Sequence, residues 1–416
     1  MSGADFRRCM GHVNSWLLVL VAFCLPISTT ATSIAALLCV LGWALGGDYR
    51  RKLAEIAANP MSRAVLAYVA VLLAGLTWNE QLAESLNGIH KQWKILLMPF
   101  FLGIIRPKQR RLVLWAFIAG MALMTLSTFL AWFGLIRYTG VPPEQLTRKT
   151  YHVVYNPMLA LAIYLVLHQL IWTRLRQRWM RPALVLLTIL MLTSMFMTDG
   201  RTGQMAVLIL LGLYFFQYFQ GSRWKAALAL VLVPVLVFCA SYKISSTFRG
   251  RIEQARQEIA IFNHNPRTSV GQRLFFWQQS LQIFRDAPLL GVGTGGFAPA
   301  YAEHNRTYTP YMPPSSNPHS QYILALVQGG LLGLAALLGL FVTQFYLALK
   351  SGDEWGRLRL AFPLFFLVIM LTESYLLIHE TGILFSLFAA VLYKEDRPEG
   401  GGRRLTRQAA PGPEPV

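Results

Sequence analysis

Acidic residues are scarce in this chain. Its 416 residues include 19 aspartates and glutamates against 38 lysines and arginines, a net charge of +19, and only 14% of all residues are charged. A soluble protein of this length would carry roughly a quarter charged residues. The acidic residues are scattered, and the polar loops contain no Asp-x-Asp and no His-x-x-x-His pair. No hard-cation site can be proposed from such a pattern, so we expect neither a metal nor another cofactor.

Cysteine is also rare, with four residues in all. The four are Cys9, Cys24, Cys39 and Cys239. Three of them lie in or beside apolar stretches, and none lies in a long polar loop. This distribution excludes a disulfide framework and a zinc cluster. We interpret the cysteines as small apolar packing residues.

Apolar residues are abundant, at 55% with a mean hydropathy of +0.44. Stretches of about 17 to 25 apolar residues, enough to cross a bilayer, recur along almost the whole chain and predict an all-α polytopic membrane protein. We place twelve transmembrane spans at 15–29, 31–47, 63–78, 93–106, 112–135, 157–173, 182–198, 203–219, 224–242, 320–348, 358–375 and 377–393. Ten or eleven spans remain open, because 93–106 is short and the first two are tightly joined. The first also resembles a signal peptide after Arg7-Arg8, but the apolar pattern resumes at once, which favours a retained helix.

Basic residues fall in every second connection between the spans and at both ends of the chain. Cytoplasmic loops of membrane proteins carry an excess of lysine and arginine, so we expect both termini in the cytoplasm and the alternate connections outside. Basic clusters of this kind are ordinary flanks of membrane helices. We therefore expect no nucleic-acid partner.

One outer connection, of about 75 residues, is far longer than the others. The predicted division is transmembrane helices 1 to 9 over 1–242, this periplasmic loop over 243–318, helices 10 to 12 over 319–393, and a disordered cytoplasmic tail over 394–416. Loops of such length are usually functional. The segments 249–262 and 271–286 predict amphipathic helices, the second suited to the membrane interface. The glycine-rich segment 289–297 lacks a P-loop lysine and predicts a tight turn with close backbone approach.

His319 stands where this loop meets the apolar stretch 320–348. The start of a helix offers unpaired N–H groups and a positive dipole end, which disfavour the imidazolium form. A neutral imidazole can accept a proton, so His319 is a candidate general base on the outer face. A histidine that merely caps its helix is the alternative.

Arg201 lies in the turn "TDGRTG", which joins two apolar spans with almost no polar spacer. Ionisable groups near membrane depth are functional candidates by default. The alternative is an arginine that reaches to the surface with Asp199 as its partner.

Arg273 lies on the predicted helix 271–286, and the long loop as a whole carries eight basic against four acidic residues. Arg148 and Lys149 in the loop 136–156 add to this positive outer surface. Guanidinium groups suit phosphate or diphosphate, so we expect an anionic ligand of that kind.

The same residues resemble those of a known family. His319 and Ser320 are followed by nine residues, Gly330, two residues and Gly333, and every fixed position is similar to the motif of the O-antigen ligases (WaaL), within a ligase/polymerase group of bacterial envelope glycosyltransferases. The turn at Arg201, the pair Arg273-x-x-x-Trp277 and the segment "APLLGVGTGGF" also resemble this family. The serine usual before the first arginine is Gly200 here. The likeness spans roughly 195–335.

The resemblance implies a GT-C-like helical fold and transfer on the periplasmic face of the bacterial inner membrane, without metal or nucleotide sugar. It implies an O-antigen polysaccharide on undecaprenyl diphosphate as donor and lipid A-core as acceptor, and it leaves the oligomeric state open. It assigns catalysis to His319, Arg201 and Arg273. Substrate contacts are expected from Arg201, Arg273, Trp277, Ser320, Gln321, Arg148 and Lys149.

Three further functions remain open. An O-antigen polymerase or a protein oligosaccharyltransferase would use the same donor. A transporter of lipid-linked sugar would place ionisable residues deep within several spans, whereas here they concentrate at the outer surface, which favours an enzyme. If His319 is not the base, the candidates for that role are Glu303, His304, His152 and Glu380.

Overall fold

The computed structural model describes residues 3–79, 81–138, 146–147, 152–175 and 177–394. Within these ranges the chain forms helices and loops and no β-strand, which confirms the all-α prediction. The helices before the long loop are α1 (Gly3–Cys24), α2 (Thr29–Leu45), α3 (Tyr49–Ala58), α4 (Pro60–Ala74), α5 (Leu82–Gln92), η1 (Trp93–Leu96), α6 (Leu97–Ile104), η2 (Pro107–Gln109), α7 (Arg110–Trp132), α8 (His152–Trp172), α9 (Met180–Met197), α10 (Arg201–Tyr218) and α11 (Arg223–Ile244). Those that follow are α12 (Ser246–Ala260), α13 (Ser269–Asp286), α14 (Phe297–Tyr308), α15 (Gln321–Lys350), α16 (Gly356–Ile369) and α17 (His379–Tyr393).

Every predicted span coincides with a helix, 93–106 with η1 and α6 together. Five helices among the described residues are long and apolar enough to cross a membrane, and the pair α2–α3, bent by 118°, would make a sixth. The chain is therefore a multi-pass membrane protein. Its twelve spans stay a prediction, since other helices on predicted spans, such as α4 and α17, are shorter.

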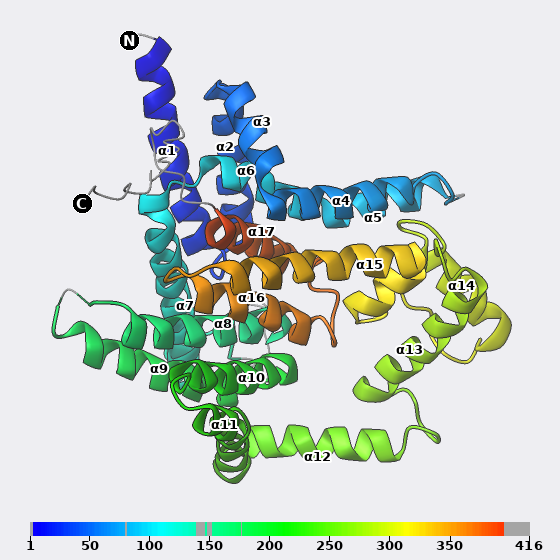
Figure 1. The fold of residues 1–416 in the computed structure, drawn as a ribbon. Coiled ribbons are helices and arrows are strands. Elements are labelled where there is room, and N and C mark those ends of the chain that lie inside the picture. The colour runs from blue at the N-terminus through cyan, green and yellow to red at the C-terminus, as the bar shows by residue number, and fades with distance from the viewer. Residues whose placement is uncertain (1–2, 80, 139–145, 148–151, 176, 395–416) are drawn as a thin grey trace, which may run out of the picture.

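The helices α4, α15 and α16 run side by side through the middle of the molecule (Figure 1). The group α8, α9 and α10 packs on one side of them, and α1 and α2 lie on the other. The core between them is rich in aromatic rings, with Phe362 packed against Phe366, Phe385 and Phe388. The large loop adds a core of its own, in which Phe276 of α13 and Tyr301 of α14 pack against Leu324 of α15. This second core fixes the loop helices to the end of α15 where His319 lies.

The predicted helices of the long loop are present as α12 and α13, and α14 is a third that the sequence did not indicate. On α13 the buried face comprises Phe275, Phe276, Gln279 and Ile283. Arg273 and Leu281, which also recur at helical spacing in this segment, are partly exposed and exposed, respectively. The face with Phe276 is buried because α14 and α15 supply an apolar surface for α13 to cover.

The glycine-rich segment forms the predicted tight turn. It packs against α15 at a break in that helix. Gly330 there has φ 59° and ψ −153°, a conformation essentially confined to glycine. Four backbone hydrogen bonds satisfy the groups freed by the break: Val292 N to Val327 O (2.9 Å), Gly293 N to Gln328 O (2.9 Å), Leu331 N to Pro288 O (2.8 Å) and Leu332 N to Leu289 O (3.2 Å). These bonds tie the turn to both halves of the helix.

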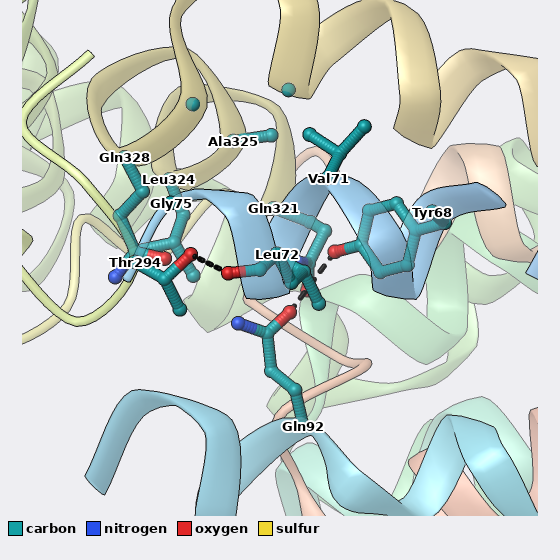
Figure 2. A pocket seen from close by; sticks show the side chains of 12 residues that line it. Tyr68, Val71, Leu72, Gly75, Gln92, Thr294, Gln321, Leu324, Ala325 and Gln328 are labelled. Atoms are coloured by element: carbon teal, nitrogen blue, oxygen red, sulfur yellow. Dashed lines mark hydrogen bonds between the residues drawn. The ribbon is translucent and has the colours of Figure 1, made fainter. Parts of the chain in front are cut away.

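The same turn contacts the end of α4. Thr294 Oγ1 donates to the carbonyl of Leu72 (2.7 Å), and the Thr294 amide donates to the carbonyl of Gly75 (3.0 Å). Figure 2 shows the small cavity, of about 20 Å³, that lies beside this contact, with Tyr68 bonded to Gln92 across it. The turn therefore joins α4, α15 and the large loop at one point.

We expect Gly330→Ala to lower the free energy of unfolding by about 2 kcal/mol or more, because alanine rarely adopts this backbone conformation. Its Cβ would also lie 2.3 Å from the carbonyl carbon of Leu289. The matched control is Gly329→Ala, whose Cβ would meet nothing within 4 Å. Thermal unfolding in detergent measures both variants. Equal unfolding temperatures would show that the break does not constrain the fold.

Candidate active site

His319 has a left-handed backbone conformation, with a φ of 52°. Residues other than glycine seldom adopt it, and strain of this kind gathers at functional sites. Two hydrogen bonds hold the segment: the His319 amide donates to Oδ1 of Asn317 (3.1 Å), and the Gln321 amide donates to the carbonyl of Met370 (3.0 Å). The position of the imidazole is therefore set before α15 begins.

The imidazole bonds to a carboxylate from the segment between α16 and α17. Nδ1 of His319 lies 2.6 Å from Oε2 of Glu373. An ionised carboxylate can only accept hydrogen bonds, so Nδ1 carries a hydrogen, and in the neutral imidazole Nε2 is then the nitrogen with the lone pair. The Glu373 side chain is 10% exposed and that of His319 is 36% exposed. The ring is thus anchored on its buried side and open on the other, the arrangement of a general base.

Glu373 is held in its charged form. Burial acts to raise the pKa of its carboxyl, but the hydrogen bond and charge of His319 and the bonds from Ser374 N (2.9 Å) and Asn317 Nδ2 (2.7 Å) outweigh burial and leave the pKa lowered. The Ser374 hydroxyl in turn donates to Oδ1 of Asn317 (2.8 Å). A closed network therefore supports the carboxylate beneath the imidazole.

The helix α13 covers the same histidine from the loop side. The ring of Phe276 stacks on the imidazole at a centroid distance of 6.2 Å, and Nε1 of Trp277 donates to the carbonyl of Pro318 (2.9 Å). Arg273 lies three and four residues before these two and so shares their side of the helix. One helix thus positions the His319 segment and carries the second predicted arginine.

Arg201 is the first residue of α10 and precedes the predicted span 203–219. Its Nη1 lies 3.9 Å from Oε2 of Glu258, a buried residue of α12. Asp199, the partner considered from the sequence, makes a forked pair with Arg251 instead. The side chain of Arg201 remains 26% exposed, so the Glu258 pair leaves part of the guanidinium open.

The two arginines lie close to each other and to the histidine segment. Burial lowers the pKa of Arg201, Glu258 raises it, and the charges of Arg251 and Arg273 lower it further. The next residue, Thr202, bonds to Thr372 (2.6 Å), the neighbour of Glu373. Among the described residues Arg273 has no ion pair. Two neighbouring guanidiniums, one of them without an ion pair, can accommodate a polyanion.

The remaining predicted site residues are placed as follows. Ser320 and Gln321 are buried, and the side-chain oxygen Oε1 of Gln321 accepts from the Leu376 amide (3.2 Å). Arg148 and Lys149 lie outside the described residues, as does the side chain of His152. The other three residues considered for the role of base have partners other than His319. Glu303 forms an ion pair with Arg306, and His304 bonds to Gln279 (2.9 Å). The carboxylate of Glu380 is close enough to Lys94 to interact with its charge.

Sequence reasoning missed Glu373 and Asn317. Glu373 begins the segment "ESYLLIHETG", which connects α16 and α17. Carboxylates are scarce in this chain, and that scarcity is the signal that could have indicated Glu373. Asn317 lies two residues before the histidine. In the parts of the chain that the structure describes, three or more His, Cys, Asp or Glu side chains nowhere gather closely enough to hold a metal ion. The site as described is therefore a histidine, a carboxylate and two arginines.

We expect Glu373 to contribute stability that depends on pH. Because its folded pKa is lowered, this stability is present above the unfolded pKa of about 4.3 and is lost as the pH falls through the folded value. As the pH falls from 7 to below that folded value, the unfolding temperature of Glu373→Gln should decrease less than that of the unmodified protein. The control Glu303→Gln removes an exposed carboxylate and should keep the parent slope. The same slope in all three would exclude a stabilising charge at Glu373.

The comparisons with known proteins concern the part of the chain that holds these residues. The profile of the O-antigen ligase family matches residues 186–338, which include Arg201, Arg273 and His319. An uncharacterized protein of Haemophilus influenzae is 24% identical over 172 residues, 39% of this chain and 42% of that protein. The chain thus aligns with less than half the length of that relative. Over residues 186–338 the chain is therefore similar to the O-antigen ligase family.

Proposed function

We propose that the protein is an O-antigen ligase. It transfers a polysaccharide from undecaprenyl diphosphate to a sugar of lipid A-core on the periplasmic face of the bacterial inner membrane, with both termini in the cytoplasm. The observation that carries the proposal is the His319–Glu373 pair beside two arginines, within the region that matches the family. A base and a cationic leaving-group site are what glycosyl transfer from a diphosphate requires.

The reaction is a single displacement. Nε2 of His319 takes the proton of an acceptor hydroxyl as its oxygen bonds to the anomeric carbon of the donor. The bond from that carbon to the diphosphate oxygen breaks, and its electron pair leaves with the diphosphate. Glu373 stabilises the imidazolium that forms, as the acid of a catalytic triad does. Arg201 and Arg273 stabilise the charge that develops on the leaving group, so no metal is needed.

A lipid-linked donor fits the position of the site. Arg201 and His319 lie at the starts of the apolar helices α10 and α15, so the polyprenyl chain can stay among the helices while the diphosphate meets the arginines. Trp277 and Gln321, whose polar groups bond to Pro318 and Leu376, support the site in addition to any substrate contact. Ser320, Arg148 and Lys149 stay predicted substrate contacts.

The acceptor separates a ligase from a polymerase and from a protein oligosaccharyltransferase. All three enzymes would use the same donor, the lipid diphosphate. Purified protein with lipid-linked O-antigen and chelator should modify lipid A-core and leave a second lipid-linked unit unextended. Extension of that unit would show that the protein is a polymerase. Modification of an added acceptor protein would show an oligosaccharyltransferase, and movement of the donor across vesicle membranes without transfer would show a transporter.

His319→Ala should retain donor binding and lose transfer by about a hundredfold to ten-thousandfold, the usual contribution of a positioned base. Single-turnover transfer at saturating donor measures this. The matched control is His304→Ala, a histidine of the same loop that bonds to Gln279 away from Glu373. Normal transfer at saturation by the His319 variant would leave it only a binding residue.

Arg201→Ala and Arg273→Ala should each reduce transfer by about a hundredfold or more, roughly 3 kcal/mol of transition-state stabilisation. Lysine should restore little, because it lacks the forked guanidinium geometry. Arg306→Ala is the control, since Arg306 lies in the same loop but pairs with Glu303. Near-normal transfer by either alanine variant would remove that arginine from the site.

A further inference from the structure

A second cationic cavity lies at the other end of the α4–α15 pair. Its volume is about 180 Å³, and Lys350, Arg359 and Lys394 line it together with Pro60, Leu347 and Tyr393. The two helices are antiparallel: Gly75, after α4, faces Thr294 near the start of α15, whereas Pro60 meets the α15 end. Arg359, near the start of α16, lines the cavity, whereas the carbonyl of Met370, after the end of α16, accepts from Gln321 beside His319, so the length of α16 separates the two sites.

The break at Gly330 folds the two halves of α15 back on each other, so the length of this helix does not measure the separation of the two sites. A Cβ on Gly333 would lie 2.8 Å from the carbonyl oxygen of Ala325, eight residues earlier, which a straight helix would place about 12 Å away. The 11 residues from Arg359 to Met370 extend about 17 Å along α16, so the cavity and the His319 segment are separate sites.

The charges of the cavity are only partly balanced. Arg359 pairs with Asp353 (2.8 Å) and donates to the carbonyl of Leu392, and Lys394 pairs with Glu55 and donates to the carbonyl of Leu102 (2.8 Å). Neither carboxylate lines the cavity. Lys350 has no carboxylate partner among the described residues, and its Nζ lies 5.7 Å from the ring centroid of Tyr346. The cavity therefore presents excess positive charge.

Four helix ends surround the cavity, and their dipoles oppose one another. Helices α4 and α16 begin beside Pro60 and Arg359, whereas α15 and α17 end beside Lys350 and Tyr393. The three basic side chains therefore decide the sign of the charge in the cavity. Along α15 an exposed apolar stripe, Leu338, Val342, Tyr346 and Leu349, leads up to Lys350. An acyl chain can lie on this stripe while a phosphate occupies the cavity. A free phosphate ion has no acyl chain and would not contact the stripe.

We propose that this cavity binds the phosphate of an anionic phospholipid headgroup. Basic pockets between transmembrane helices are known to recognise such headgroups. The built part of the site is the pair Arg359 and Lys394, both nearly buried and fixed by carbonyls, and Lys350 supplies the unbalanced charge. The bound lipid would join the ends of α4, α15 and α17.

The test uses the full-length protein in neutral detergent. Short-chain phosphatidylglycerol is titrated and its binding followed by native mass spectrometry, with phosphatidylcholine of equal chain length and inorganic phosphate as separate arms. Lys350→Glu should weaken phosphatidylglycerol binding about fivefold or more, since each basic residue near an anionic surface contributes about fivefold. The control is Lys225→Glu, an exposed lysine whose Nζ lies 5.5 Å from the ring centroid of Trp224, outside the cavity.

Phosphatidylglycerol should bind more tightly than phosphatidylcholine, and only Lys350→Glu should remove the difference. Equal weakening by both lysine variants, or equal binding of the two lipids, would overturn the proposal. Displacement of phosphatidylglycerol by millimolar inorganic phosphate in the parent protein, absent in Lys350→Glu, would overturn the lipid as the ligand and assign the cavity to free phosphate.

Discussion

The break in α15 at Gly330 is the constraint on which the candidate site depends. A helix interrupted inside a membrane protein must find partners for the backbone groups that the break frees, because lipid supplies none. Here the turn 288–294 supplies them from the large loop, and the same turn bonds to the end of α4. The loop is thereby held against α15 by backbone bonds that no side-chain substitution in the turn removes directly. Since α13 belongs to that loop, Arg273 and the rings that cover His319 are fixed by the same junction.

The buried charges at the two ends of the helical core differ in sign. At the end near Lys350, buried cations are satisfied by carbonyls: Arg110 donates to Val391 and Leu392 and lies 4.1 Å from the ring centroid of Trp355. Such cations complement the negative ends of helices and stabilise the packing. At the His319 end the carboxylate is the buried member, and the arginines remain partly open. Buried positive charge therefore stabilises the packing at the Lys350 end, whereas at the His319 end the buried charge is negative.

Much of this could be predicted from the sequence, for reasons that differ by residue. The apolar stretches form helices at each predicted position because hydropathy reports burial in lipid directly. His319 and its glycines follow a fixed spacing, and the structure explains one position of it: Gly330 is where the helix must break. Glu373 could not be found in this way, because it lies 54 residues further along the chain and only packing brings it to Nδ1. The same holds for the ion pair of Arg201 with Glu258 of another helix, which the sequence did not indicate beside the nearby Asp199.

The features that break local rules gather in one place, and this concentration supports a functional role for that place. His319 has a backbone conformation that costs about 1–3 kcal/mol for a residue with a side chain. Arg201 stands near two other guanidiniums, and Glu373 is a charged group in a buried position. None of these arrangements is the most stable one for an empty site. A diphosphate would relieve the repulsion between the arginines, and a proton accepted at Nε2 would be balanced by the carboxylate behind Nδ1. The strain in the free protein is thus of the kind that substrate and transition state remove, which is where electrostatic preorganisation lowers a barrier.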